Sequence, residues 1–175
     1  MPNLCNNFVT IRGDRAELDS VANILQAHKE RRDTGLKCES PRWQIDTIER
    51  EGNIIMVHGP SAWVPPHDML TEISSKHDVS IRNEYDEIGV NFAGHTYYER
   101  GYDFDFNLQF YEYFFFNNID EFQAQLEILI MTMKPESTFD DVKEILLNGW
   151  ENTPDSSALQ TMEQMYNRSK QNLFQ

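Results

Sequence analysis

The segment Asn7-Phe8-Val9-Thr10-Ile11-Arg12-Gly13-Asp14 contains the first strand-to-helix transition of the chain. Its alternation and its β-branched residues predict a short strand over 7–12, which Gly13 ends. Asp14, with Glu17 three residues later, has the spacing of a capping box and predicts that a helix begins here. The apolar positions that follow recur every three or four residues, as on one face of an amphipathic helix: Leu18, Val21, Leu25 and His28.

A hairpin and a second helix are predicted next. Strand-type residues occupy 42–51 and 53–58, and the Gly52-Asn53 pair between them is a hairpin signal. Trp63-Val64-Pro65-Pro66 follows, and proline is tolerated in the first turn of a helix. This helix is expected to present one apolar stripe: Met69, Leu70, Ile73 and His77.

Three further strands are predicted over 79–85, 90–98 and 103–115. In the last one, Phe104, Phe106, Leu108 and Phe110 alternate with Asp103, Asp105, Asn107 and Gln109. Strict period two predicts that the apolar side of this strand is buried and that the other side is wet and acidic.

After Asn118 the period becomes helical. One helix is predicted from Asn118 to the break at Pro135, and a second from the Thr138/Asp141 cap to Gly149. Thr153-Pro154-Asp155 is expected to be a linker before a final helix.

The element order is therefore β-α-β-β-α-β-β-β followed by helices. Its beginning matches the split βαβ arrangement of ferredoxin-like folds. We predict an α+β fold: a ferredoxin-like antiparallel sheet with two packed helices, an extra β-hairpin and a C-terminal helical extension. The expected division is a domain over 1–116 and an extension over 117–175 that packs on the same domain.

Acidic residues dominate the charge of the chain. Its 175 residues include 29 acidic and 15 basic side chains, a net charge of −14. Binding to a nucleic-acid backbone needs lysine and arginine, so this balance disfavours it. The simplest interpretation is a solvated acidic surface. The more specific interpretation is an acidic face that binds a basic protein surface, with these candidate residues: Glu84, Asp86, Glu87, Asp103, Asp105 and Glu112.

No motif for catalysis, metal binding or a cofactor is evident. The five histidines and two cysteines lack metal-ligand spacing, and no nucleophile elbow or glycine-rich phosphate loop is present. Cys5 and Cys38 are expected to be reduced packing residues. The neighbouring carboxylates Asp103 and Asp105 permit a glycosidase or divalent-metal interpretation, but such pairs are usually surface residues. We therefore predict a non-enzymatic protein without cofactor or metal.

The cellular location is inferred from two kinds of segment that the sequence lacks, a membrane-spanning helix and a secretory signal. No apolar run approaches the roughly 20 residues of a membrane-spanning helix, and the first residues do not resemble a secretory signal. We expect a cytoplasmic protein that does not bind a membrane.

Aromatic residues are dense between Tyr97 and Phe116. On a ferredoxin-like sheet, exposed aromatic side chains can stack the bases of RNA. RNA binding also needs basic residues, and Arg100 is the only lysine or arginine between Glu84 and Glu121. We therefore expect these rings to form part of the core or a contact with another protein. The apolar run 111–116 also makes a homo-oligomer plausible.

Three motifs together carry a family resemblance: Pro2-Asn3-Leu4-Cys5-Asn6-Asn7, Ser61-Ala62-Trp63-Val64-Pro65-Pro66 and Glu84-Tyr85-Asp86-Glu87-Ile88-Gly89-Val90-Asn91-Phe92-Ala93-Gly94. Over about residues 1–98 the chain resembles the YubB ferredoxin-like family of phage and conjugative-plasmid proteins. Leu4 departs from the tryptophan usual in that family. The resemblance implies the fold and a mobile-element origin, and no established activity. Its motif residues are expected to be structural, or alternatively to line a ligand cleft: Trp63, Pro65, Pro66, Tyr85, Gly89, Phe92 and Gly94.

Two functions remain open from the sequence. The leading hypothesis is a phage- or plasmid-encoded protein that inhibits or redirects a nucleic-acid-handling or defence protein of the host through its acidic face, in one version by mimicking nucleic acid. The alternative is a protein that sequesters a small ligand or nucleotide in a pocket near Trp63, Tyr85 and Phe92.

Overall fold

The computed structural model describes residues 4–38, 40, 42–87, 89, 91–150 and 154–174. Pro2 and Asn3 of the first motif, Ile88 and Val90 of the third, and Thr153 of the expected linker lie outside these residues. The chain divides into two compact units, residues 1–107 and 108–175, which are described separately below.

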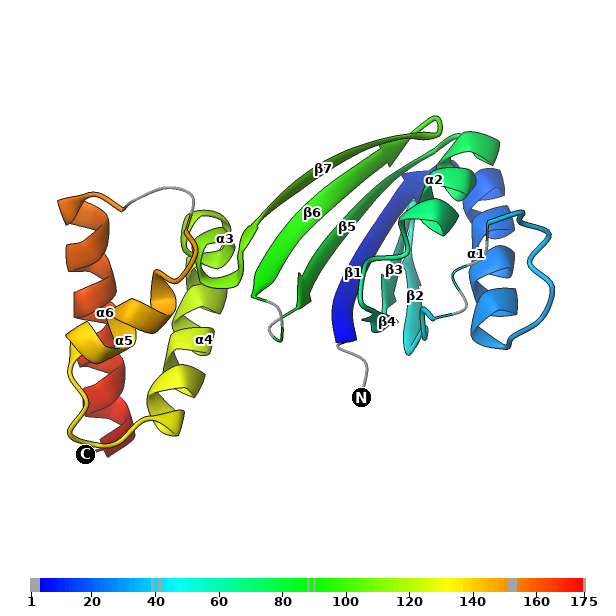
Figure 1. Cartoon of the computed structure of the whole chain (residues 1–175). Coiled ribbons are helices and arrows are strands. Elements are labelled where there is room, and N and C mark those ends of the chain that lie inside the picture. The colour runs from blue at the N-terminus through cyan, green and yellow to red at the C-terminus, as the bar shows by residue number, and fades with distance from the viewer. Residues whose placement is uncertain are drawn as a thin grey trace. The chain divides into compact units, whose positions relative to one another are not determined.

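The first unit follows the predicted order of strands and helices, with one additional short strand, β4, before the second helix (Figure 1). Its elements are β1 (Leu4–Gly13), α1 (Arg15–Lys29), β2 (Thr47–Glu51), β3 (Ile54–His58), β4 (Ser61–Ala62), α2 (His67–Lys76), β5 (Val79–Glu87), β6 (Phe92–Glu99) and β7 (Tyr102–Gln109). The last two residues of β7 belong to the second unit.

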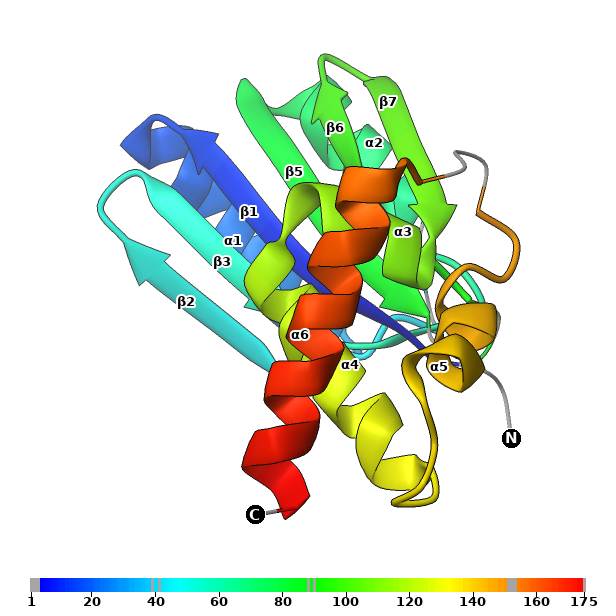
Figure 2. The same ribbon diagram turned by 90° about the vertical axis from the view of Figure 1, so that its left-hand side faces the viewer.

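The strands form one sheet in the order β2-β3-β1-β5-β6-β7 (Figure 2). The short strand β4 pairs with β1. β1 lies between β3 and β5 and is antiparallel to both, so that Val9 is opposite Val57 on one side and Asn83 on the other. This arrangement of β2, β3, β1 and β5 with two helices is the ferredoxin-like core. The β6–β7 hairpin extends the sheet beyond it, which confirms the predicted fold.

The core of this unit lies between the sheet and its two helices, which cover the same face (Figure 1). Alternate residues of β1 point into it, including Val9 and Ile11, and meet the stripes predicted for the helices. The core consists mainly of Val9, Ile11, Leu18, Val21, Leu25, Trp43, Ile55, Val57, Met69, Leu70, Ile73, Ile81 and Tyr98. The opposite face of the sheet is covered by neither helix of this unit, and we call it the open face.

Local signals place most element boundaries as the sequence predicts. The Asp14 side chain accepts a hydrogen bond from the Glu17 N–H at 2.9 Å and caps α1. Gly52 adopts a positive φ of 57° in the β2–β3 turn, and Pro66 precedes α2. The strand predicted over 42–51 is shorter, however, because β2 begins at Thr47.

The second unit is helical. It contains α3 (Phe110–Asn117), α4 (Ile119–Thr132), α5 (Phe139–Leu146) and α6 (Ser156–Phe174). A capping box between Thr138 and Asp141 starts α5, and the Asn118 side chain caps α4, both as predicted. The core of the unit is built from Phe122, Leu126, Ile130, Val142, Leu146, Met162 and Tyr166.

The prediction of one strand over 103–115 is wrong beyond residue 109, because α3 begins at Phe110. The aromatic run contacts itself at helical spacing, with the Phe110 and Phe114 rings 5.0 Å apart. Phe115 packs against Phe122 of α4 at 5.1 Å. Packing against α4 therefore outweighs the strand preference of an aromatic-rich segment.

Candidate functional site

The open face of the sheet exposes large apolar side chains from several strands. Directly opposite residues of neighbouring strands share a face of the sheet. Phe8 points to the open face and is opposite His58 in β3 and Glu84 in β5, so these residues and every second residue along their strands also lie on the open face. Its exposed apolar residues have 38% to 72% of their surface accessible: Leu4, Phe8, Met56, Tyr97, Tyr102, Phe104 and Phe106. A group of this size on one face is typical of an interaction surface.

Aromatic contacts join parts of this face into two clusters. On the β1–β3 side, the Phe8 and His58 rings stack with their centroids 4.6 Å apart. On the other side, the His95 ring is 5.3 Å from that of Tyr97 and 5.4 Å from that of Phe106. These contacts restrict the side chains before binding, which lowers the entropy lost when a partner immobilises them.

Two shallow hollows flank Thr10 on the same face. One, of about 300 Å³, is lined by Thr10, Arg12, Ser80, Ile81, Arg82 and Tyr97. The other, of about 220 Å³, includes Phe8, Thr10, Thr47, Glu49, Met56 and His58 in its lining. Hollows of this kind suit single anchoring side chains of a protein partner better than a whole cofactor.

Charge on the open face is mainly negative. By strand register it carries the acids Glu49, Glu51, Glu84, Asp86 and Glu99 and the bases Arg12 and Arg82. Arg82 forms an ion pair with Glu84, and its guanidinium lies 5.6 Å from the centroid of the Tyr97 ring. Burial, and then the charge of Arg82, lower the pKa of His95, so this residue adds little positive charge near neutral pH.

The six acids predicted to form one partner-binding face are divided in the structure. Glu84 and Asp86 lie on the open face, where Asp86 accepts a hydrogen bond from Asn6 at 3.0 Å. Asp105 lies on the other side of the sheet, since it accepts hydrogen bonds from Tyr85 at 2.7 Å and from Thr96. Asp103 shares that side by alternation along β7.

Glu87 and Glu112 are buried, with 1% and 0% of their surface exposed. The expectation of a single exposed acidic face is therefore wrong for these two residues. The prediction that the apolar side of β7 is buried is also wrong, because Phe104 and Phe106 are exposed on the open face. The aspartates of β7 lie on the other side of the sheet. β7 is an edge strand that remains exposed along most of its length, so burial does not determine its orientation. Hydrogen bonds to Asp105 stabilise the observed orientation of β7. Desolvation raises the pKa of Asp105, but bonds from Thr96, Tyr85 and Asn107 outweigh it and lower the pKa overall.

Several of the family-motif residues pack together at one end of the sheet. The rings of Tyr85 and Phe92 are 5.8 Å apart, and Gly94 is directly opposite Tyr85 in the β5–β6 register. Pro65 and Pro66 are buried before α2. Trp63 is half exposed with a positive φ of 74°, and Gly89 is exposed in a turn. The close packing of Tyr85, Phe92 and Gly94 fits the structural interpretation of the motif.

A buried asparagine links the first two motifs. The Asn7 side-chain amide donates to the carbonyl oxygens of Cys5 at 2.9 Å and Gly59 at 3.2 Å, and to the hydroxyl of Ser61 at 2.9 Å. Its oxygen accepts a bond from Asn83 at 3.1 Å. The sequence motif therefore encodes a network that fixes β1 against the β3–β4 connection.

Two kinds of reactive centre can be checked among the described side chains, metal sites and thiols. They contain no group of three His, Cys, Asp or Glu residues placed to hold a metal ion. Burial, followed by the charges of Asp86 and Glu87, raises the pKa of Cys5 to about 12. Desolvation and the nearby Glu72 carboxylate also raise the pKa of Cys38. Both thiols are therefore weak nucleophiles at neutral pH.

Glu87 provides a prediction about stability. Its Oε2 atom is buried and has no hydrogen-bond partner among the described residues. Desolvation, and then the charge of Asp86, raise the pKa of its carboxyl group. We expect Glu87→Gln to increase the free energy of unfolding at pH 7.5 by about 1–2 kcal/mol, because an uncompensated buried charge is removed.

The pH dependence of this effect has a definite sign. A raised pKa means that the folded protein holds a proton that the unfolded chain releases, so wild-type stability decreases as pH rises through that interval. The gain from Glu87→Gln should therefore be small at pH 4.5 and complete at pH 7.5 in urea unfolding. Glu84→Gln, on the open face, is the matched control and should change stability by less than about 0.5 kcal/mol. An equal gain at both pH values would contradict this explanation.

Sequence reasoning identified Tyr97 among the aromatic residues but missed Phe8, Met56 and Phe104 as members of the open face. The signal available was the alternation of β1, which places Phe8 opposite to Val9. Alternation alone does not show how large the side chains on the uncovered side of the sheet are once the strands are placed next to one another.

Comparison with known proteins identifies the family. Residues 42–129 match the model of the ferredoxin-like domain in Api92-like protein, and the chain belongs to this family. No curated protein and no solved structure matches the chain. Within the described residues, no helix combines the length and apolar character needed to cross a bilayer.

Proposed function

We propose that this member of the Api92-like ferredoxin-like family is a non-enzymatic protein that binds one protein partner through the open face of its sheet. The observation that carries the proposal is the combination on this face of exposed aromatic side chains, two small hollows and an excess of acids. Aromatic side chains supply most of the energy of many protein interfaces.

The partner that fits has apolar anchoring residues surrounded by basic ones. Five acids against two bases on the open face favour a positive surface and disfavour a nucleic-acid backbone. Proteins that bind nucleic acid have basic surfaces, so a nucleic-acid-handling or defence protein of a host is the partner that we propose. The resemblance to phage and conjugative-plasmid proteins supports an origin on a mobile element and action in the host cytoplasm by inhibiting or redirecting this factor.

Acidic mimicry of nucleic acid has less support than a mixed apolar and acidic interface. Asp105 is held by Tyr85 and Thr96, and Glu112 is buried. The acids available to a partner on the open face are Glu49, Glu51, Glu84, Asp86 and Glu99. They surround aromatic residues, whereas a mimic of a phosphate backbone needs a continuous run of negative charge.

The test begins with tagged full-length protein and host lysate, followed by purification of the retained protein and titration of the two components. We expect Phe8→Ser with Phe106→Ser to weaken binding at least about 100-fold, since each position removes a central aromatic contact. Phe174→Ser in α6 is the matched control, because Phe174 is as exposed as Phe8, at 49% and 50%. The control should bind like the wild type.

Three outcomes would overturn the proposal. The first is equal affinity of the double variant and the wild type. The second is retention of nucleic acid with no protein partner, and the third is self-association that covers the open face. Raising the salt concentration should weaken the wild-type complex, and Glu84→Lys with Asp86→Lys should reduce that salt dependence.

A further inference from the structure

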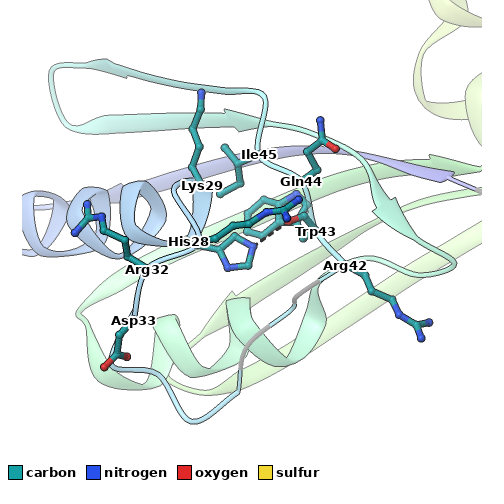
Figure 3. Close-up of a pocket in the computed structure, with 9 residues that line it drawn as sticks. His28, Lys29, Arg32, Asp33, Arg42, Trp43, Gln44 and Ile45 are labelled. Carbon is teal, nitrogen blue, oxygen red and sulfur yellow. Dashed lines mark hydrogen bonds between the residues drawn. The ribbon is translucent and has the colours of Figure 1, made fainter.

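The sheet unit also contains a cleft lined mainly by basic residues, in contrast to the acidic open face. The cleft has a volume of about 830 Å³ and lies at the end of α1, beside the irregular segment that precedes β2 (Figure 3). Its lining residues are His28, Lys29, Arg31, Arg32, Asp33, Arg42, Trp43, Gln44 and Ile45. The volume is within the range of sites that hold small ligands.

The floor of the cleft is rigid. Trp43 is 3% exposed, and its indole N–H donates to the carbonyl oxygen of Gly59 at 3.1 Å. The imidazole of His28 lies beside it and donates from Nε2 to the Trp43 carbonyl oxygen at 2.9 Å (Figure 3). These bonds join the last turn of α1 to the segment before β2, so they fix the two sides of the cleft relative to each other.

Positive charge surrounds this floor. The lining contains four lysine or arginine residues and one acid, in a chain with 15 basic and 29 acidic residues. Arg32 forms an ion pair with Glu30 at 2.6 Å. Lys29 donates to the backbone oxygen of Asp46, and within the described part of the chain Lys29, Arg31 and Arg42 form no ion pair. The labelled side chains of Lys29, Arg32 and Arg42 extend on different sides of the His28–Trp43 pair (Figure 3).

Arg31 occupies a position that favours glycine. The Arg32 N–H donates to the Ala27 carbonyl and the Arg31 N–H to the His28 carbonyl, which is the Schellman pattern at the end of a helix. Arg31 is the residue in the left-handed conformation, with φ 56°. This position is usually glycine because a side chain is disfavoured there. Cations at a helix C-terminus are favourable in general, but the last turn already contains Lys29, so that effect does not require arginine at this site.

We infer that this cleft binds a small phosphorylated ligand of the nucleotide class. Guanidinium groups pair with phosphate oxygens through two parallel hydrogen bonds. Arg31 and Arg42, which form no ion pair with a described acid, supply this chemistry, and Lys29 adds a third positive charge. The cleft is larger than one phosphate requires, and cations on different sides of it suit a ligand with more than one phosphate. The inference is independent of the protein partner proposed for the open face.

The test uses ATP as the probe and the full-length chain, with binding measured by titration calorimetry at low salt. We expect a dissociation constant below about 100 μM for the wild type and a tenfold or greater increase in Arg31→Gly and in Arg42→Ala. Arg31→Gly should also raise the melting temperature by about 2–4 °C, because glycine relieves the left-handed conformation. Loss of binding in a more stable variant excludes unfolding as its cause.

Lys134→Ala, which removes one charge from the helical unit, is the control and should bind ATP like the wild type. Failure of the wild type to bind ATP or pyrophosphate below about 1 mM would overturn the inference, as would unchanged affinity in Arg31→Gly. Binding of a single-stranded oligonucleotide without binding of ATP would replace it by a nucleic-acid site. None of these outcomes depends on whether the open face binds a protein.

Discussion

Gly94→Ala is expected to lower the free energy of unfolding of the sheet unit by about 3 kcal/mol and to detach β7. A methyl group on Gly94 would lie 2.3 Å from the Phe106 carbonyl oxygen, 2.7 Å from the Tyr85 hydroxyl and 2.9 Å from the Asn107 Cα. Two of these three neighbours are backbone atoms, which cannot move without shifting β7. The Tyr85 hydroxyl would also lose its position beside Asp105.

Urea unfolding followed by circular dichroism measures the stability change, and amide hydrogen exchange across 102–107 measures the state of β7. Gly35→Ala is the control, since Gly35 has a positive φ of 70° but no atom within 4 Å of the added methyl group. It should lower stability by about 1 kcal/mol and leave β7 protected. Native exchange in Gly94→Ala would show that the strand can accept the methyl group.

Gly94→Ala also tests whether β7 contributes to the proposed protein-binding face. Phe104 and Phe106 belong to β7, so its displacement removes two aromatic residues from the open face. A variant that retains a folded core but loses β7 should bind the protein partner as weakly as the Phe8→Ser, Phe106→Ser double variant. ATP binding at the α1 cleft should persist, because none of its lining residues is in β6 or β7.

Local chemistry made much of the fold predictable. Asp14 with Glu17, Gly52 in a hairpin turn and Thr138 with Asp141 each mark an element boundary through contacts within a few residues. The apolar faces of the helices could also be predicted, because their residues recur every three or four positions in the sequence. Such signals determine where elements begin and end, and the split βαβ order then limits their arrangement.

The parts that sequence could not predict depend on contacts between distant residues. The run 110–116 has the composition of a strand and becomes helical by packing on α4. The orientation of β7 depends on Asp105 meeting Tyr85, which is 20 residues away. The basic cleft depends on Arg42 lying near the end of α1, where Arg31 occupies a glycine-type position that a composition count does not reveal.

Asn7→Ala is expected to have the largest effect on stability, lowering the free energy of unfolding by about 3–5 kcal/mol. The change removes an amide group whose two N–H donors are shared among three acceptors, and one accepted bond, at a site with no solvent exposure. The Asn83 amide and the Cys5 carbonyl lose these bonds without gaining access to water, whereas Gly59 retains its bond from Trp43. Each buried polar group left without a partner costs about 1–3 kcal/mol.

Asn6→Ala is the matched control, because the same residue type is removed one position earlier in β1. Asn6 is exposed and donates one bond, to Asp86, so its replacement should lower stability by less than about 0.5 kcal/mol. Urea unfolding of both variants gives the comparison. Similar losses in the two variants would mean that the network around Asn7 does not fix the sheet. A large loss confined to Asn7→Ala would explain the Asn in the first motif by folding alone, without a ligand.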